Sequence, residues 1–181
     1  MRFIKKIVVV FGPPFSGKDT VGKRLAADFN LEHVSTSGLL EAHVPKFRTL
    51  TQGGKLAPDQ MMIELFKKHL KSSELVLNTP RSATQLGWVA GKLDPTVEAL
   101  AIKFDLKKKE IEARRDKVAQ TSRGPRMDDA ALEERLREYN LYAAEVIPIL
   151  RRSYRFLQVD GARSEEEVYA DCKAFCASRF R

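Results

Sequence analysis

Cysteines are scarce in this sequence, and long hydrophobic runs are missing from it. Its 181 residues include only two cysteines, Cys172 and Cys176. Their i, i+4 spacing puts both on one face of an expected helix, where they suit a hydrophobic core better than a disulfide framework. No apolar run approaches the roughly 18 residues of a membrane-spanning helix, and the short run near the N-terminus leads into a glycine loop instead of a signal-peptide cleavage site. We therefore expect a protein without a membrane span, in a reduced, cytoplasmic setting.

Acidic residues are in the minority. Lysine and arginine total 32 against 24 for aspartate and glutamate, which gives a net charge of +8. Such an excess suits the binding of a polyanion, either a nucleotide or a nucleic acid, and it equally suits a basic surface with no specific ligand. The sequence is 43% hydrophobic and shows no internal repeat, low-complexity tract or interdomain linker, which indicates one compact domain.

Short apolar runs alternate with longer amphipathic segments along the chain. Residues 7–11 form a continuous, largely β-branched run, as expected for a strand that is buried on both faces. The alternation predicts a parallel sheet with helices on both faces, and residues 45–57 and 116–127 are expected to be surface excursions. The expected strands are 7–11, 32–35, 75–77, 99–104 and 155–159, and the expected helices are 18–29, 37–44, 59–70, one from about 82, 107–119, 128–152 and 164–180.

The segment FGPPFSGKDTVGKRLA, residues 11–26, fits the phosphate-loop pattern between its strand and its helix. Gly12 and Gly17 let backbone N–H groups approach a phosphate, and the start of the following helix adds a positive dipole end. Lys18 supplies a charge for the β- and γ-phosphates. Thr20, one place later than the pattern requires, offers a hydroxyl for phosphate or Mg²⁺. The alternative is a tight turn with a solvated lysine.

This loop resembles that of the adenylate kinase family of nucleoside monophosphate kinases, Gly-x-Pro-Gly-x-Gly-Lys-Gly-Thr. Phe15 and Asp19 stand where the family has glycines. We expect the Asp19 carboxylate to point away from the phosphates, because a carboxylate in the first turn of a helix is favoured by the helix dipole. Pointing inward, it would repel phosphate unless Mg²⁺ lay between them. The corresponding residues here are Gly12, Pro13, Pro14, Phe15, Ser16, Gly17, Lys18, Asp19 and Thr20.

The resemblance continues at the acceptor side. Ser35 and Thr36 match the family's monophosphate-site segment, and Glu41 stands where the family has an arginine on the acceptor phosphate. Residues 53–62, which include Leu56, are similar to the segment beside the acceptor base. Arg81 matches a phosphate-binding arginine, Gln85 an adenine-reading glutamine, and Asn78 replaces an aspartate that orients water on Mg²⁺. Gln85 could instead close a capping box with Ser82.

The second half of the chain matches as well. The family has a lid segment that closes over the nucleotides, and it corresponds here to about residues 116–127. Arg114 fits a family arginine before the lid, Arg126 one in the lid and Arg135 one after it. Gly161 fits a family position near the ATP adenine. Arg114 and Arg135 could also be solvated charges on helix surfaces, as Arg137 is expected to be. A further lid arginine falls at Val118, so Lys117 or Arg123 could serve in its place. The short lid has no cysteines and so no zinc site.

The resemblance implies a P-loop NTPase-type α/β fold of three layers, with a five-stranded parallel sheet. Residues 1–181 would form a single kinase domain with a shortened monophosphate-binding excursion at about 35–65 and a short lid at about 116–127. The implied reaction is reversible phosphoryl transfer from MgATP to AMP or another nucleoside monophosphate, and no residue is assigned as a metal ligand. The implied catalytic residues are Lys18, Arg81, Arg126 and Arg135; residues 12–20, Arg114 and Gly161 would bind ATP, and Ser35, Thr36, Leu56, Arg81 and Gln85 would bind the acceptor.

Two other functions stay open. Glu41 replaces an arginine that the family uses at the acceptor phosphate, and Asn78 replaces an aspartate that it uses near the metal. The enzyme could therefore phosphorylate another small acceptor. A nucleotide-binding protein with weak activity and an RNA-associated role is a hypothesis of another class. The cluster of arginines near the lid has no aromatic residues interleaved with it, which favours nucleotide binding over nucleic acid, and we expect a monomer.

Overall fold

A single parallel sheet organises the chain. The computed structural model describes residues 3–78, 80–120 and 131–180. Within them the strands have the order β2-β3-β1-β4-β5, and every neighbouring pair is parallel. The strands are β1 (Lys6–Phe11), β2 (Glu32–Ser35), β3 (Glu74–Asn78), β4 (Leu100–Asp105) and β5 (Arg155–Asp160). All five lie within two residues of their predicted positions.

The helices also follow the predicted order, with small differences at their ends. Two short elements lie in a stretch that was predicted to be irregular, and neither buries a residue, so no hydrophobic period marks them in the sequence. The elements are α1 (Lys18–Asp28), α2 (Thr36–His43), α3 (Phe47–Leu50), η1 (Gln52–Gly54), α4 (Asp59–His69), α5 (Ala83–Ala90), α6 (Lys108–Ala119), α7 (Leu132–Ser153) and α8 (Glu165–Ala177).

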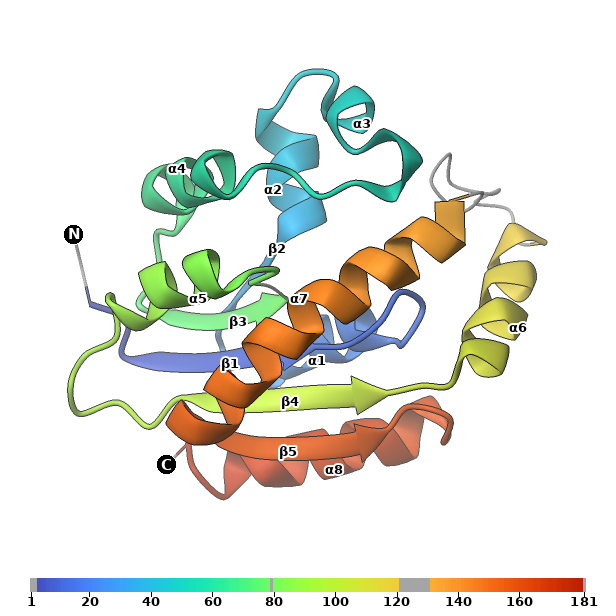
Figure 1. The fold of residues 1–181 in the computed structure, drawn as a ribbon. Coiled ribbons are helices and arrows are strands. Elements are labelled where there is room, and N and C mark those ends of the chain that lie inside the picture. Colours follow the sequence, from blue (N-terminus) through green and yellow to red (C-terminus); the bar gives the residue numbers. More distant parts are fainter. Residues whose placement is uncertain (1–2, 79, 121–130, 181) are drawn as a thin grey trace.

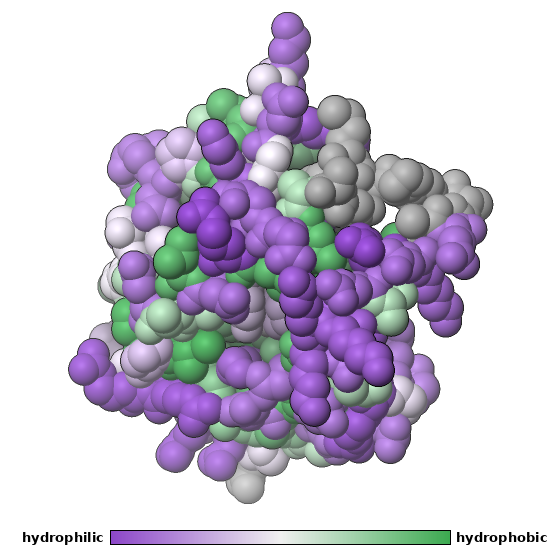
Figure 2. All heavy atoms as spheres, turned by 45° about the vertical axis from the view of Figure 1, so that its right-hand side comes forward, coloured by the Kyte–Doolittle hydropathy of each residue, from purple (hydrophilic) through white to green (hydrophobic). Residues whose placement is uncertain are grey.

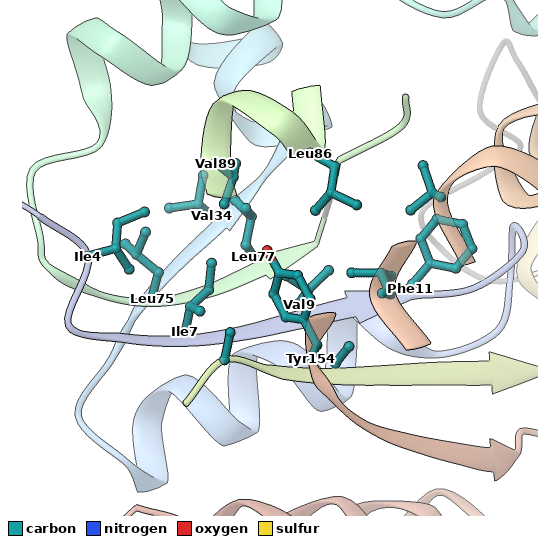
Figure 3. Packing of buried hydrophobic residues seen from close by; sticks show 14 of the residues in the cluster. Ile4, Ile7, Val9, Phe11, Val34, Leu75, Leu77, Leu86, Val89 and Tyr154 are labelled. Atoms are coloured by element: carbon teal, nitrogen blue, oxygen red, sulfur yellow. The ribbon is translucent and has the colours of Figure 1, made fainter. Parts of the chain in front are cut away.

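The alternation of side chains along β1 separates two cores. Ile7, Val9 and Phe11 point to the face that α5 and α7 cover, whereas Val8 and Val10 point to the face that α1 and α8 cover. Figure 3 shows the first face, with Leu86 and Val89 of α5 lying over the side chains of the sheet. The result is a three-layer α/β fold of the P-loop NTPase type, as the sequence predicted (Figure 1).

The prediction about the two cysteines is confirmed, and a separate small core lies beside the sheet. Cys172 and Cys176 are free thiols, fully buried between α8 and the sheet. Met62 and Phe66 of α4 form a smaller core with Leu40 of α2, which fixes these two helices to each other beside the sheet. Among the residues that the structure describes, no helix combines the length and hydropathy that crossing a membrane requires.

Candidate functional site

A cavity of about 720 Å³ lies at the carboxyl ends of the strands, where ligands bind in open α/β sheets. Its walls come from the loop after β1, from β4, α1, α2, α3, α6, α7 and α8, and from the turn between β5 and α8. Figure 2 brings this side of the molecule forward and shows a largely hydrophilic surface with some hydrophobic residues between the polar ones. The cavity has room for a nucleotide.

The loop after β1 depends on glycine at two positions. A Cβ on Gly12 would lie 2.8 Å from Cβ of Phe104 and 2.9 Å from Oγ of Ser16, so no side chain fits there. Gly17, the N-cap of α1, has φ +86°, in the left-handed region that glycine adopts readily. Phe15 also has a positive φ, of 61°, although it has a side chain. Pro13 and Pro14 are buried within this loop.

Lys18 reaches back over the loop, and its Nζ donates a hydrogen bond to the carbonyl oxygen of Pro13 at 3.1 Å. Burial lowers the pKa of Lys18 to about 8; the charge of Asp19 opposes this shift, and the charges of Arg81 and Arg135 reinforce it. Lys18 therefore lies close to two arginines. Arg135 of α7 also lines the cavity, whereas Arg81 lies in the loop between β3 and α5 and is not part of the cavity wall. Such a group of cations at the edge of a cavity favours the binding of a phosphorylated anion.

The orientation predicted for Asp19 is wrong. Asp19 lines the cavity, and its Oδ1 accepts a hydrogen bond of 2.8 Å from Nδ2 of Asn78, the last residue of β3. Although burial acts in the opposite direction, the charge of Lys18 and the bond from Asn78 hold the pKa of the Asp19 carboxyl below its usual range. The hydrogen bond from Asn78 therefore determines the direction of the Asp19 side chain, which the helix dipole alone does not determine.

Arg81 and Gln85 follow β3 and are joined to each other. The backbone N–H of Arg81 donates to Oε1 of Gln85 at 3.0 Å, and Nε2 of Gln85 donates to Oδ1 of Asp59 at 2.8 Å. Ser82 accepts from the backbone N–H of Gln85 at 3.1 Å, which is one of the two bonds of the capping box considered above. With 2% of its surface exposed, Gln85 supports the segment that carries Arg81. Asp59, whose carboxylate also accepts from Ser82, was not singled out by the sequence.

The acceptor-side residues lie on α2 and beyond it. Ser35 caps α2 by accepting from the backbone N–H of Gly38 at 3.1 Å. Thr36 is buried, and its hydroxyl has no hydrogen-bond partner within the described part of the chain. Leu56 lies half-buried between η1 and α4. None of these three residues lines the cavity, whose wall on this side is formed by Glu41 and Arg48.

Glu41 and Arg48 both line the cavity and form a loose ion pair, with 3.9 Å between Arg48 Nη2 and Glu41 Oε1. Their side chains are 67% and 61% exposed, so the pair adds little to stability. Arg48 is a cation of the site that the sequence did not single out. It lies in the stretch predicted to be irregular, where no pattern gave its direction.

On the other wall, Arg114 connects two parts of the site. Its guanidinium donates to the carbonyl oxygen of Phe15 at 3.3 Å and to that of Gly161. Gly161 itself packs so closely that a Cβ would lie 2.8 Å from the carbonyl oxygen of Asp105. Arg114 is thus anchored in the site, and the alternative of a solvated surface charge does not describe it.

Arg135 and Arg137 face different surroundings on α7. Arg135 lines the cavity, with its guanidinium 5.4 Å from the centre of the Phe15 ring. Arg137 is exposed and pairs with Glu134, as the sequence predicted for it. Lys117 and Val118, at the end of α6, also line the cavity. Arg126 and Arg123 lie outside the described residues.

The oxygen donors near Lys18 suit Mg²⁺ carried by a nucleotide. Asp19 offers a carboxylate and Thr20 a hydroxyl, and both line the cavity. In the described ranges no group of three or more His, Cys, Asp or Glu side chains could hold a metal ion alone. Mg²⁺ in such sites keeps several waters and is bound by one or two carboxylates together with substrate phosphates, which this donor set can supply.

Several curated proteins that resemble this chain are named adenylate kinase. No protein-family model matches the chain. The adenylate kinase of Parvibaculum lavamentivorans is 31% identical over 89% of this chain and 87% of its own length. That of Deinococcus radiodurans is 30% identical over 91% of this chain and 93% of its own, and "Adenylate kinase 1" of a Nostoc species is 26% identical over 94% and 98%. The chain therefore belongs to the adenylate kinase family and is a phosphotransferase of the nucleoside monophosphate kinase type.

Proposed function

We propose that the protein catalyses reversible phosphoryl transfer from MgATP to AMP. The observation that carries this proposal is the grouping of three cations at the carboxyl edge of the sheet. Lys18 and Arg135 line the cavity, and Arg81 follows β3, close enough for both arginines to lower the pKa of Lys18. Phosphoryl transfer asks the protein chiefly to align donor and acceptor and to neutralise charge on the moving group. Three cations from three separate segments of the chain suit that task, and Arg126 is the fourth member proposed from the sequence.

The donor ATP would lie along the loop of residues 12–20. The backbone N–H groups at the start of α1 and the Lys18 ammonium would bind its phosphates. Arg114 and Gly161, which are joined by a hydrogen bond, would form the wall beside its base. Mg²⁺, when bound, neutralises charge on the donor phosphates, and Asp19 and Thr20 are the residues placed to hold its water shell.

The acceptor would lie on the opposite side of Lys18, within the excursion at about 35–65. Ser35, Thr36 and Leu56 would contact the monophosphate, and Arg81 would bind its phosphate. The proposed contact of Gln85 with the acceptor base would be made from a buried side chain that already bonds to Asp59. We retain the plan of one domain, 1–181, with a short lid at about 116–127, and of a monomeric, cytoplasmic enzyme, as proposals.

A coupled assay with MgATP and a panel of monophosphates tests the function. We expect ADP formation with AMP and a lower kcat/KM with GMP, CMP and UMP. The reverse reaction, in which two ADP molecules give ATP and AMP, should run in the same preparation. A folded protein that transfers phosphate to no monophosphate would contradict the proposal.

One observation favours a second acceptor as the alternative. The carboxylate of Glu41 lines the cavity and would repel an acceptor phosphate placed near it. An acceptor with a hydroxyl or amine at this place would meet a hydrogen-bond acceptor instead. If a non-phosphorylated nucleoside gives a higher kcat/KM than AMP in the same assay, that nucleoside replaces AMP as the proposed acceptor.

A further inference from the structure

Asp19 and Asn78 form a pair that the phosphate loop itself does not require. Asn78 ends β3 and is 4% exposed, and its Nδ2 donates to Oδ1 of Asp19 at 2.8 Å and to the backbone carbonyl oxygen of Lys18 at 3.3 Å. Both partners are acceptors, so only the amide nitrogen can face them. The side chain of Asn78 thus holds the Asp19 carboxylate in one position at the cavity wall.

This position is kept although Asn78 leaves an atom unsatisfied. Its Oδ1 is buried without a hydrogen-bond partner among the described residues, and a Cβ on Gly22 would lie 2.6 Å from it. Gly22 of α1 thus leaves no room for a side chain beside this amide. A buried carbonyl without a partner costs free energy. The bonds that the amide nitrogen donates to Asp19 and Lys18 must offset this cost, because they require this orientation of the amide.

The second oxygen of Asp19 accepts no hydrogen bond from residues 3–78, 80–120 or 131–180. No hydrogen bond reaches Oδ2 from the described part of the chain, and no cation lies within 4.0 Å of the carboxylate there, because Lys18 donates to Pro13 instead. An ionised carboxylate next to a triphosphate would be strongly repelled. A divalent cation between them removes that repulsion and uses the free oxygen.

We propose that Asp19 is a positioning residue for the Mg²⁺ of the donor nucleotide, in which its Oδ2 accepts hydrogen bonds from metal-bound water while Asn78 holds its Oδ1. This inference rests on the proposed function, because it presupposes a donor nucleotide on the loop. It also explains two departures from the family pattern together: the carboxylate missing at position 78 is present at position 19, across one hydrogen bond. A carboxylate at both positions would place two like charges in contact.

The alternative is that Asp19 only stabilises the first turn of α1 through the helix dipole. The two roles differ in what depends on the metal. A structural role affects folding and nucleotide binding equally with and without Mg²⁺. A positioning role affects only the gain in affinity that Mg²⁺ produces.

Calorimetric titration with a non-hydrolysable ATP analogue, in Mg²⁺ and in EDTA, measures that gain. Asp19→Asn is isosteric and can still accept the hydrogen bond from Asn78. We expect the ratio of the affinity in Mg²⁺ to that in EDTA to be about tenfold smaller in this variant than in the wild type, as is typical for outer-shell partners of metals. Its affinity in EDTA should be equal to or tighter than that of the wild type. Glu166→Gln, which removes a nearby exposed carboxylate that is not part of the cavity wall, should leave the gain unchanged.

The double variant Asp19→Gly, Asn78→Asp sharpens the test, because it moves the carboxylate back to the end of β3. It should recover most of the Mg²⁺-dependent gain that Asp19→Gly alone loses. The inference is overturned if Asp19→Asn keeps the full gain, or if both nucleotide states weaken equally. If the wild type binds the analogue in neither buffer, the proposed function itself fails, and this outcome is distinct from the other two.

Discussion

The two ends of the cavity are built differently. At the donor end, the loop is tightly packed: Ser16 is 2% exposed, and neither Gly12 nor Gly161 has room for a Cβ. At the acceptor end, Glu41 and Arg48 are 67% and 61% exposed and meet only in a loose pair. The comparison indicates that the donor site is fixed by backbone and core, whereas acceptor choice depends on side chains that can change at little structural cost.

The largest effect is expected at the donor end, from Lys18→Ala. Losing one preorganised charge on the transferred group costs roughly 3 kcal/mol or more of transition-state stabilisation, a loss of at least about 100-fold in kcat. Steady-state kinetics with MgATP and AMP measures it. Circular dichroism should show an intact fold, because the side chain lines a cavity and supports no core.

Arg137→Ala is the matched control, since it removes a cation from an exposed position on α7. Its kcat should be close to that of the wild type. Near-normal turnover of a folded Lys18→Ala variant would mean that Lys18 takes no part in phosphoryl transfer, and it would contradict the proposed donor site.

Gly12→Ala tests whether the donor end tolerates any added volume. The new methyl group would meet Phe104 and Ser16 at distances below 3 Å, and overpacking of this kind typically costs about 1–3 kcal/mol of stability. Urea unfolding measures the loss. Gly87→Ala in α5 is the control: its Cβ meets nothing within 4 Å, so it should gain roughly 0.5–1 kcal/mol from helix propensity. Equal midpoints for the two variants would show that the loop is looser than its contacts imply.

Glu41→Arg tests the acceptor end, where a smaller effect is expected. It replaces a repelling charge by one that can bind a phosphate and also releases Arg48 from its pair. At so exposed a position we expect about 1 kcal/mol, or a roughly fivefold rise in kcat/KM for AMP. Glu41→Gln, which only removes the repulsion, should give part of the gain. Unchanged AMP kinetics in both variants would mean that Glu41 does not face the acceptor.

The same contrast explains what the sequence could predict. The loop, the strand before it and the helix after it are contiguous, so spacing and periodicity place Gly12, Gly17 and Lys18 correctly. Arg48 and the short helix α3 carry no buried residue and no period, so their place in the wall could not be predicted. The direction of Asp19, in helix α1, was predicted wrongly because Asn78, which decides it, lies at the end of strand β3, 59 residues away in the sequence.

The smallest effect concerns the pH dependence of folding, and it returns to Lys18. Its pKa in the folded protein is lowered to about 8 from an ordinary 10.5, first by burial. The unfolded chain therefore binds more protons at this residue between these two values, and stability rises with pH wherever that holds. The free-energy cost of burying the charged Lys18 is fully present below about pH 8 and is lost as the pH rises toward 10.5.

Urea titrations across this pH range measure the effect. The free energy of unfolding should rise with pH relative to that of Lys18→Met, which has no titrating group at this position. Identical slopes in the two proteins would contradict the lowered pKa. A saturating phosphate analogue should flatten the difference, because a bound anion restores the charged form of Lys18 and so joins the titration to the donor site.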